Sequence, residues 1–162
     1  MLKVLLVDDE PFIVQGLSAL IDWEKEGFEI VGTAGNGSEA VEFLKSNPVD
    51  LILADIKMPV MNGLEFLKYI RETHLSEAFF VILSGYGDFT YAKEAIKWQC
   101  TDYILKPIQK SQLLALLSKV KQMQQDKKEE SERIRKIGKA YFVRQMHTHV
   151  FFGSICWCVF IY

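Results

Sequence analysis

Apolar residues along this chain form short runs that alternate with stretches in which they recur at helical spacing. The short runs predict five strands, and the helical spacing between them predicts five helices. The predicted strands are Lys3–Val7, Phe28–Ala34, Leu51–Ala54, Phe79–Leu83 and Asp102–Leu105. The predicted helices are Phe12–Ile21, residues 36–47, Leu64–Arg71, Phe89–Trp98 and a segment that begins near Ser111.

This regular alternation of strand and helix predicts an α/β fold, in which helices cover both faces of a parallel sheet. Five strands joined by short crossovers favour a flavodoxin-like, doubly wound five-stranded sheet with the strand order 2-1-3-4-5. Sheets of this kind place their sites where the strand order reverses, which here is between the first and third strands. The ends of those two strands are therefore expected to lie side by side.

Polar residues stand where four of the predicted strands end. Asp8 and Asp9 follow the first strand, Asp55 the third, Ser84 the fourth and Lys106 the fifth. Three carboxylates in one pocket form an oxygen-rich set that suits Mg²⁺, and a lysine ammonium suits phosphate. This set predicts phosphoryl transfer onto Asp55.

Each of these residues also has an ordinary structural interpretation. Asp9 fits the N-cap of the first predicted helix, Ser84 alone is typical of a turn, and Lys106 alone is typical of an exposed surface. Asn62-Gly63 provides turn chemistry and predicts a cap for the third helix. The occurrence of all the polar residues at strand ends, in this order, is what favours a site.

These motifs resemble the pattern of response-regulator receiver domains of two-component systems, over about residues 1–122. The matching segments are Val7-Asp8-Asp9-Glu10, Asp55-Ile-Lys-Met-Pro59-x-Met-Asn-Gly63, Ser84-Gly85 and Asp102-Tyr-Ile-Leu-Lys106-Pro107. The resemblance implies a CheY-like fold and a phosphohistidine of a sensor histidine kinase as the phosphoryl donor.

By the same resemblance Asp55 is the phosphoacceptor. The resemblance also implies that Mg²⁺ is held by Asp8, Asp9, Asp55 and the backbone carbonyl of Lys57. These four residues are the metal site that we expect.

The resemblance assigns the remaining pattern residues to phosphate binding and switching. Ser84 and Lys106 are expected to bind the phosphoryl oxygens, and Tyr103 is expected to move together with Ser84 on phosphorylation. The peptide bond between Lys106 and Pro107 is expected to be cis.

Two further positions are predicted to tune the lifetime of the phosphoryl group. Lys57 lies two residues after Asp55, and Tyr86 lies two residues after Ser84. Side chains there flank the path of an attacking water, and the bulk of Tyr86 is expected to slow hydrolysis.

A narrower resemblance extends to receivers attached to AraC-type DNA-binding domains in Gram-positive bacteria. The segments that carry it include Gly27-Phe-Glu-Ile-Val-Gly32, Ser84-Gly-Tyr-Gly-Asp-Phe89 and Tyr91-Ala-Lys-Glu-Ala-Ile96. No helix-turn-helix pair can be fitted after Val120. Control of transcription is therefore expected only through an effector domain that this sequence does not contain.

Two rival functions remain open at this point. One is a phosphate-independent interaction module, and the other is a hydrolase with an aspartyl-phosphate intermediate. Such hydrolases generally carry an acid two residues after the nucleophile, where this chain has Lys57. Beyond self-phosphorylation and self-dephosphorylation, enzymatic activity is not expected.

Charge is unevenly distributed along the chain, whose formal net charge is -2. Residues 121–144 carry eight Lys/Arg and four Asp/Glu, a local +4, which leaves -6 for residues 1–120. An acidic domain followed by a basic helix is not typical of a nucleic-acid-binding fold. Three cysteines provide no disulfide framework, and neither a signal peptide nor a membrane span is expected, so the predicted location is the cytoplasm.

The C-terminal region is predicted as a helical linker at 123–146 and an apolar tail of uncertain status at 147–162. Two series at heptad spacing indicate a coiled-coil seam with a polar middle: Leu113, Val120, Lys127, Ile134 and Tyr141, and Leu116, Met123, Glu130, Ile137 and Arg144. A solvated linker helix is the alternative. A homodimer is expected either through this linker or through helix four, strand five and helix five, where Trp98 and Tyr103 lie.

Overall fold

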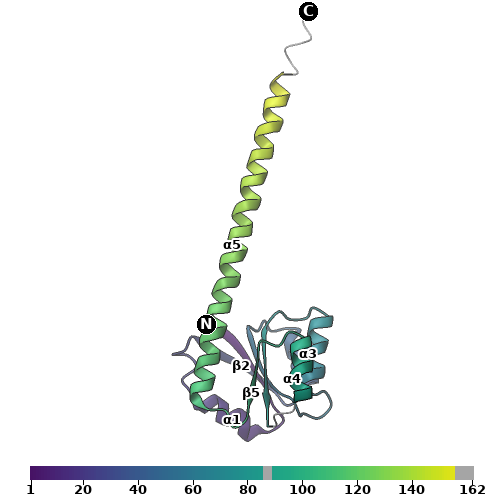
Figure 1. The fold of residues 1–162 in the computed structure, drawn as a ribbon, viewed down its shortest axis with the longest axis vertical. Coiled ribbons are helices and arrows are strands. Elements are labelled where there is room, and N and C mark those ends of the chain that lie inside the picture. Colours follow the sequence, from purple (N-terminus) through teal and green to yellow (C-terminus); the bar gives the residue numbers. More distant parts are fainter. Residues whose placement is uncertain (86–88, 156–162) are drawn as a thin grey trace, which may run out of the picture. The chain divides into compact units, whose positions relative to one another are not determined.

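The computed structural model describes the backbone of residues 1–85 and 89–155, and the side chains of residues 1–85 and 91–137. The chain divides into two units, residues 1–120 and 121–162 (Figure 1).

The first unit contains a five-stranded, all-parallel sheet. Its strands are β1 (Leu2–Val7), β2 (Phe28–Ala34), β3 (Leu51–Asp55), β4 (Phe79–Ser84) and β5 (Asp102–Leu105). They pair in the order β2-β1-β3-β4-β5, which confirms the predicted doubly wound topology. The helices are α1 (Pro11–Leu20), α2 (Gly37–Leu44), α3 (Gly63–Glu72), α4 (Phe89–Lys97) and α5 (Lys110–Ile155).

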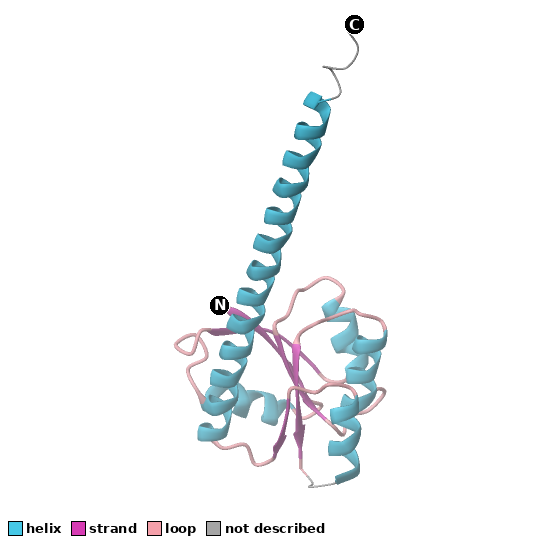
Figure 2. Ribbon diagram, turned by 45° about the horizontal axis from the view of Figure 1, so that its top comes forward, coloured by secondary structure: helices cyan, strands magenta, loops and turns pink. Residues whose placement is uncertain are grey.

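Helices cover both faces of this sheet, with α3 and α4 on one face and α1 and the first turns of α5 on the other (Figures 1 and 2). Every residue of β3 and β4 is buried, as the uninterrupted apolar runs predict for central parallel strands. Phe66 of α3 packs edge-on against Phe80 of β4, with ring centroids 5.4 Å apart. The core therefore lies against the two strands that end at Asp55 and Ser84.

Asparagine caps begin two of these helices, and the one at Asn62 confirms the predicted cap of the third helix. The Asn36 side chain accepts a hydrogen bond from the Glu39 N–H at 3.0 Å. Asn62 accepts from the Glu65 N–H at 2.9 Å, and the Glu65 side chain accepts in return from the Asn62 N–H at 3.0 Å. This reciprocal pair fixes the start of α3 at Gly63.

The alternative interpretation of Asp9, as the cap of the first helix, does not hold. The N-cap of α1 is Glu10, whose side chain makes no capping bond. Asp8 instead accepts the Glu10 N–H at 2.9 Å, and Pro11, in the first turn, has no N–H to satisfy. Asp9 is therefore left exposed beside the strand end.

Part of the coiled-coil seam that was predicted along α5 is wrong. Leu113, Leu116 and Val120 are buried within the first unit, so they belong to the domain core and are not open to a second chain. In the second unit the helix continues without a break through 123–146 and on to Ile155. Among the described residues, no helix is both long and apolar enough to cross a membrane. The tail beyond Ile155 lies outside the described residues.

We expect Gln99→Gly to raise the free energy of unfolding by about 0.5 kcal/mol. Gln99 has a φ of 59° in the turn that ends α4, where the Gln99 N–H donates to the Ile96 carbonyl and the Cys100 N–H to the Ala95 carbonyl. Glycine adopts this left-handed conformation at less cost than glutamine. Urea denaturation measures the change. The control Lys93→Gly, at an exposed position inside α4, should lower stability, and a loss in both variants would contradict the prediction.

Candidate functional site

The site is built on the ends of neighbouring strands. Val7 of β1 pairs with Ala54 of β3, so the residues that follow them, Asp8 and Asp55, lie next to each other at the carboxyl edge of the sheet. Both are buried, with exposed fractions of 4% for Asp8 and 7% for Asp55. Two buried carboxylates this close repel one another unless a positive charge lies between them.

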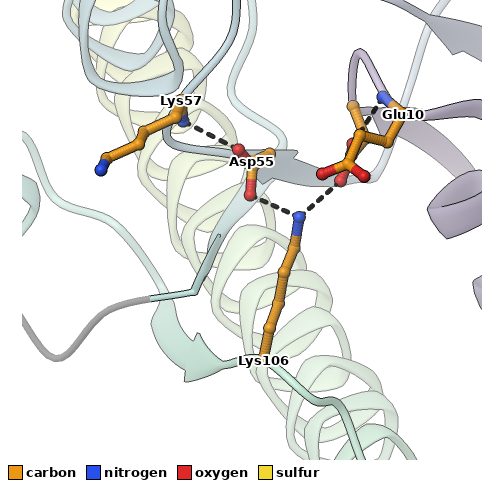
Figure 3. A network of polar contacts seen from close by, with 5 residues as sticks. Glu10, Asp55, Lys57 and Lys106 are labelled. Carbon is orange, nitrogen blue, oxygen red and sulfur yellow. Dashed lines mark hydrogen bonds and ion pairs between the residues drawn. The ribbon is translucent and has the colours of Figure 1, made fainter.

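Lys106 supplies that charge. Its Nζ lies 2.7 Å from an Asp8 oxygen and 2.6 Å from Asp55 Oδ1 (Figure 3). The other Asp55 oxygen, Oδ2, accepts the Lys57 N–H at 2.8 Å. Each oxygen of the Asp55 carboxylate is thus held by one donor, which fixes its orientation at the strand end.

The two carboxylates keep the Lys106 amine charged. Burial by itself lowers the pKa of Lys106, but its hydrogen bonds to Asp55 and Asp8 and their negative charges outweigh burial and raise the pKa above its ordinary value of 10.5. The group is therefore an ammonium at neutral pH, aimed at the side chain that is the predicted phosphoacceptor.

Beside these side chains the surface forms a small open depression of about 320 Å³. Acidic, basic and hydroxyl-bearing residues share its lining, which consists of Asp9, Glu10, Asp55, Ile56, Lys57, Ser84, Gly85 and Lys106. The depression has room for a phosphoryl group beside Asp55, with the Lys106 ammonium and the Ser84 side chain on its wall.

Of the other predicted residues, Ser84 and Lys57 line this depression. Ser84 is buried at the end of β4, and its carbonyl accepts the Lys106 N–H at 2.7 Å. The Lys106–Pro107 peptide bond is cis. Tyr103 is half-buried and lines a separate groove between β5 and α5. The side chain of Lys57 points away from Asp55 (Figure 3), and Tyr86 lies outside the described residues.

The three predicted metal carboxylates are not gathered around one point. In the described part of the chain, no three His, Cys, Asp or Glu side chains are arranged to hold a metal ion. The Lys106 ammonium lies between Asp8 and Asp55, while Asp9 lines the depression from its exposed position. The residues nevertheless fit Mg²⁺, because the Asp8 and Asp55 carboxylates already share one cation and Mg²⁺ needs only one or two carboxylates together with water.

The contact that Gly63 makes with the site was not evident from the sequence. Its N–H donates to the Ile56 carbonyl at 3.0 Å, which brings the start of α3 directly against the end of β3. A Cβ at this position would collide with the backbone carbonyl of Asp55. The pair Asn62-Gly63 indicated only a turn and a cap, because nothing local in the sequence shows which strand the glycine touches.

Comparisons with known proteins identify the class. The model of the response regulator receiver domain matches residues 4–118, so this chain belongs to the receiver-domain family. It is 40% identical over 120 residues to the transcriptional regulatory protein YesN of Bacillus subtilis, covering 74% of this chain and 32% of that protein. The chain thus spans about a third of that relative's length.

Solved structures agree with this assignment. The receiver domain of AraT, a response regulator from Geobacillus stearothermophilus, is 38% identical and matches with a TM-score of 0.72, over 78% of this chain and 98% of that one. The CheX–CheY–BeF3–Mg²⁺ complex from Borrelia burgdorferi is 31% identical, with a TM-score of 0.67, over 74% of this chain and 88% of that one.

Proposed function

We propose that Asp55 accepts a phosphoryl group from a phosphohistidine of a sensor histidine kinase. An Asp55 carboxylate oxygen attacks phosphorus, and the phosphorus–nitrogen bond to the histidine breaks. The electron pair of that bond returns to the imidazole nitrogen, which takes up a proton, and Asp55 becomes an acyl phosphate. The observation that carries the proposal is the buried Asp8–Lys106–Asp55 arrangement, in which the nucleophile is oriented from both oxygens.

The chain's own residues have distinct roles in this step. Lys106 turns from its Asp55 contact to a phosphoryl oxygen, while Ser84 donates its hydroxyl to another. Burial of Asp55 limits the access of water to the acyl phosphate. Mg²⁺ would be held by Asp8, Asp9, Asp55 and the Lys57 carbonyl, and when bound it neutralises phosphoryl charge.

Phosphorylation then acts on a surface away from Asp55. We propose that Ser84 and Tyr103 move together and change the face formed by α4, β5 and α5. The names of the relatives support control of transcription. This chain would exert that control in the cytoplasm, through an effector domain outside the present sequence. We predict that this effector domain is of the AraC type. Dimerisation through that face or through the linker helix completes the proposed mechanism.

The direct test is incubation with acetyl phosphate and Mg²⁺, followed by intact-mass measurement. We expect a single, stable phosphoryl adduct, and we expect EDTA to suppress it. Turnover of acetyl phosphate without an adduct would favour a hydrolase. Absence of both adduct and turnover would contradict the proposed function and favour a phosphate-independent module.

We expect Lys106→Met to lower the free energy of unfolding by about 3 kcal/mol, since it leaves the buried Asp8 and Asp55 carboxylates without their common partner. Thermal unfolding measures the loss. Added Mg²⁺ should stabilise this variant more than the wild type, because the cation replaces the missing charge. Lys110→Met, at an exposed lysine, is the control. A variant as stable as the wild type would show that the ion pairs contribute nothing.

A further inference from the structure

Helix α2 is bound at its first N–H to the loop of residues 57–62, which connects β3 to α3. The opening N–H groups of a helix have no partner inside that helix. Gly37, the first residue of α2, donates its N–H to the Met61 carbonyl at 2.9 Å. The start of α2 is itself fixed, because the Asn36 side chain accepts the Glu39 N–H and donates to the Glu39 carboxylate. The 57–62 loop is therefore tied to an anchored helix end.

This contact leaves no room for a side chain at position 37. A Cβ there would lie 2.7 Å from Met61 Cγ and 2.8 Å from Phe66 Cβ, closer than real Cβ atoms approach. Phe66 is fully buried, so α2 would have to move away from the 57–62 loop. The Gly37 backbone is helical, and glycine is thus needed here for space and not for its conformation.

Val60 explains why the loop needs an anchor. Its φ of 68° lies in the left-handed region, which β-branched residues rarely adopt. Its side chain is 86% exposed, so packing of that side chain does not hold it there. A strained residue keeps its conformation only where its surroundings impose it. Hydrogen bonds around Val60 do so, because Gly37 holds Met61 and the Gly63 N–H donates to the Ile56 carbonyl at 3.0 Å.

The same loop begins with groups that act on Asp55. The Lys57 N–H donates to Asp55 Oδ2 at 2.8 Å, and the Lys57 carbonyl is a proposed ligand of Mg²⁺. If Val60 relaxed to an ordinary φ, the short chain between Ile56 and Met61 would change its course, and both backbone groups of Lys57 would turn. The anchor at Met61 therefore reaches the site through the backbone of the loop.

We propose that Gly37 and Met61 are positioning residues for phosphorylation, which hold Val60 in its left-handed conformation and keep the Lys57 backbone aimed at Asp55 and Mg²⁺. This inference rests on the proposed function, because it assumes that the Asp55 site takes up Mg²⁺ and a phosphoryl group. Both residues act through the 57–62 loop. Substitutions at positions 37 and 60 should therefore affect Mg²⁺ affinity jointly, although α2 and the loop are separate elements.

Titration of the unphosphorylated full chain with Mg²⁺ alone, followed by NMR of its amide groups, tests this coupling. We expect Gly37→Ala to weaken Mg²⁺ binding about tenfold, as loss of an outer-shell partner of a metal site does. The matched control is Gly32→Ala, in which a Cβ would overlap the Phe43 ring instead. It should lower the urea midpoint but leave Mg²⁺ affinity unchanged. Equal losses of affinity in both variants, or no loss in Gly37→Ala, would overturn the proposal.

Val60→Asn provides the rescue. Asparagine adopts the left-handed conformation at less cost than valine, so this variant should have a higher urea midpoint than the wild type and the same Mg²⁺ affinity. The double variant Gly37→Ala/Val60→Asn should recover most of the lost Mg²⁺ affinity, because its loop keeps its course without the anchor. Independent effects of the two substitutions on Mg²⁺ affinity would overturn the coupling. A urea midpoint that does not rise in Val60→Asn would overturn the strain on which it depends.

Adduct formation from acetyl phosphate separates this inference from the proposed function. Gly37→Ala should still form the Asp55 adduct at saturating Mg²⁺, with a higher Mg²⁺ concentration at half-maximal rate. An adduct with the same Mg²⁺ dependence as the wild type would overturn the positioning role and leave phosphoryl acceptance by Asp55 intact. A wild-type chain that forms no adduct would overturn the proposed function and this inference together.

Discussion

Asp55→Asn is expected to abolish the phosphoryl adduct while leaving the fold intact. Asparagine has nearly the shape of aspartate, and its side-chain oxygen still accepts the Lys57 N–H. Lys106 keeps its contact with Asp8, and one of the two buried negative charges is removed. An amide cannot form an acyl phosphate, so the intact mass after acetyl phosphate treatment should equal that of the untreated variant.

The control for this variant is Glu10→Gln, which changes a carboxylate on the wall of the same depression. We expect Glu10→Gln to accept the phosphoryl group as the wild type does. In thermal unfolding, the free energy of unfolding of Asp55→Asn should be at most about 1 kcal/mol below that of the wild type. A phosphoryl adduct in Asp55→Asn would show that another carboxylate, such as Asp9, is the acceptor.

Gly63→Ala is expected to lower the free energy of unfolding by about 3 kcal/mol. The added methyl group would overlap the carbonyl of Asp55, so either α3 or the end of β3 has to move. Because that carbonyl belongs to the proposed phosphoacceptor, the same displacement should also slow phosphorylation by acetyl phosphate. Urea denaturation and the rate of adduct formation measure the two effects.

Gly16→Ala is the matched control, because it makes the same change inside α1 where a Cβ meets nothing within 4 Å. There the substitution should raise stability by about 0.5–1 kcal/mol, as alanine favours the helix. If Gly63→Ala also left the free energy of unfolding unchanged or raised it, the prediction that a side chain at position 63 displaces α3 or the end of β3 would be contradicted.

The sequence was most informative where a buried strand ends in a charge. Leu51–Ala54 cannot be followed by an unpaired carboxylate inside the protein, so Asp55 had to lie at the edge of the sheet. The doubly wound order then placed Asp8 beside it, and the structure shows both carboxylates meeting at Lys106. Strand pattern and topology together were enough to predict this convergence.

Features that depend on distant packing were not predictable in the same way. The seven-residue spacing of Leu113 and Val120 is compatible with a coiled coil and with a domain core, and only the fold shows that these side chains are used in the core. The residue type of Asp9 also suits a helix cap, but the Asp8 side chain accepts the Glu10 N–H. The role of Gly63 depends on a contact with a strand eight residues earlier in the chain.

Chemical trapping of the phosphorylated residue tests the central claim most directly. Borohydride reduces an acyl phosphate on aspartate to homoserine, and peptide mass spectrometry then locates the reduced position. After treatment with acetyl phosphate and Mg²⁺, homoserine is predicted at position 55. Homoserine at position 8 or 9, or an adduct that resists reduction, would contradict the assignment of Asp55 as the phosphoacceptor.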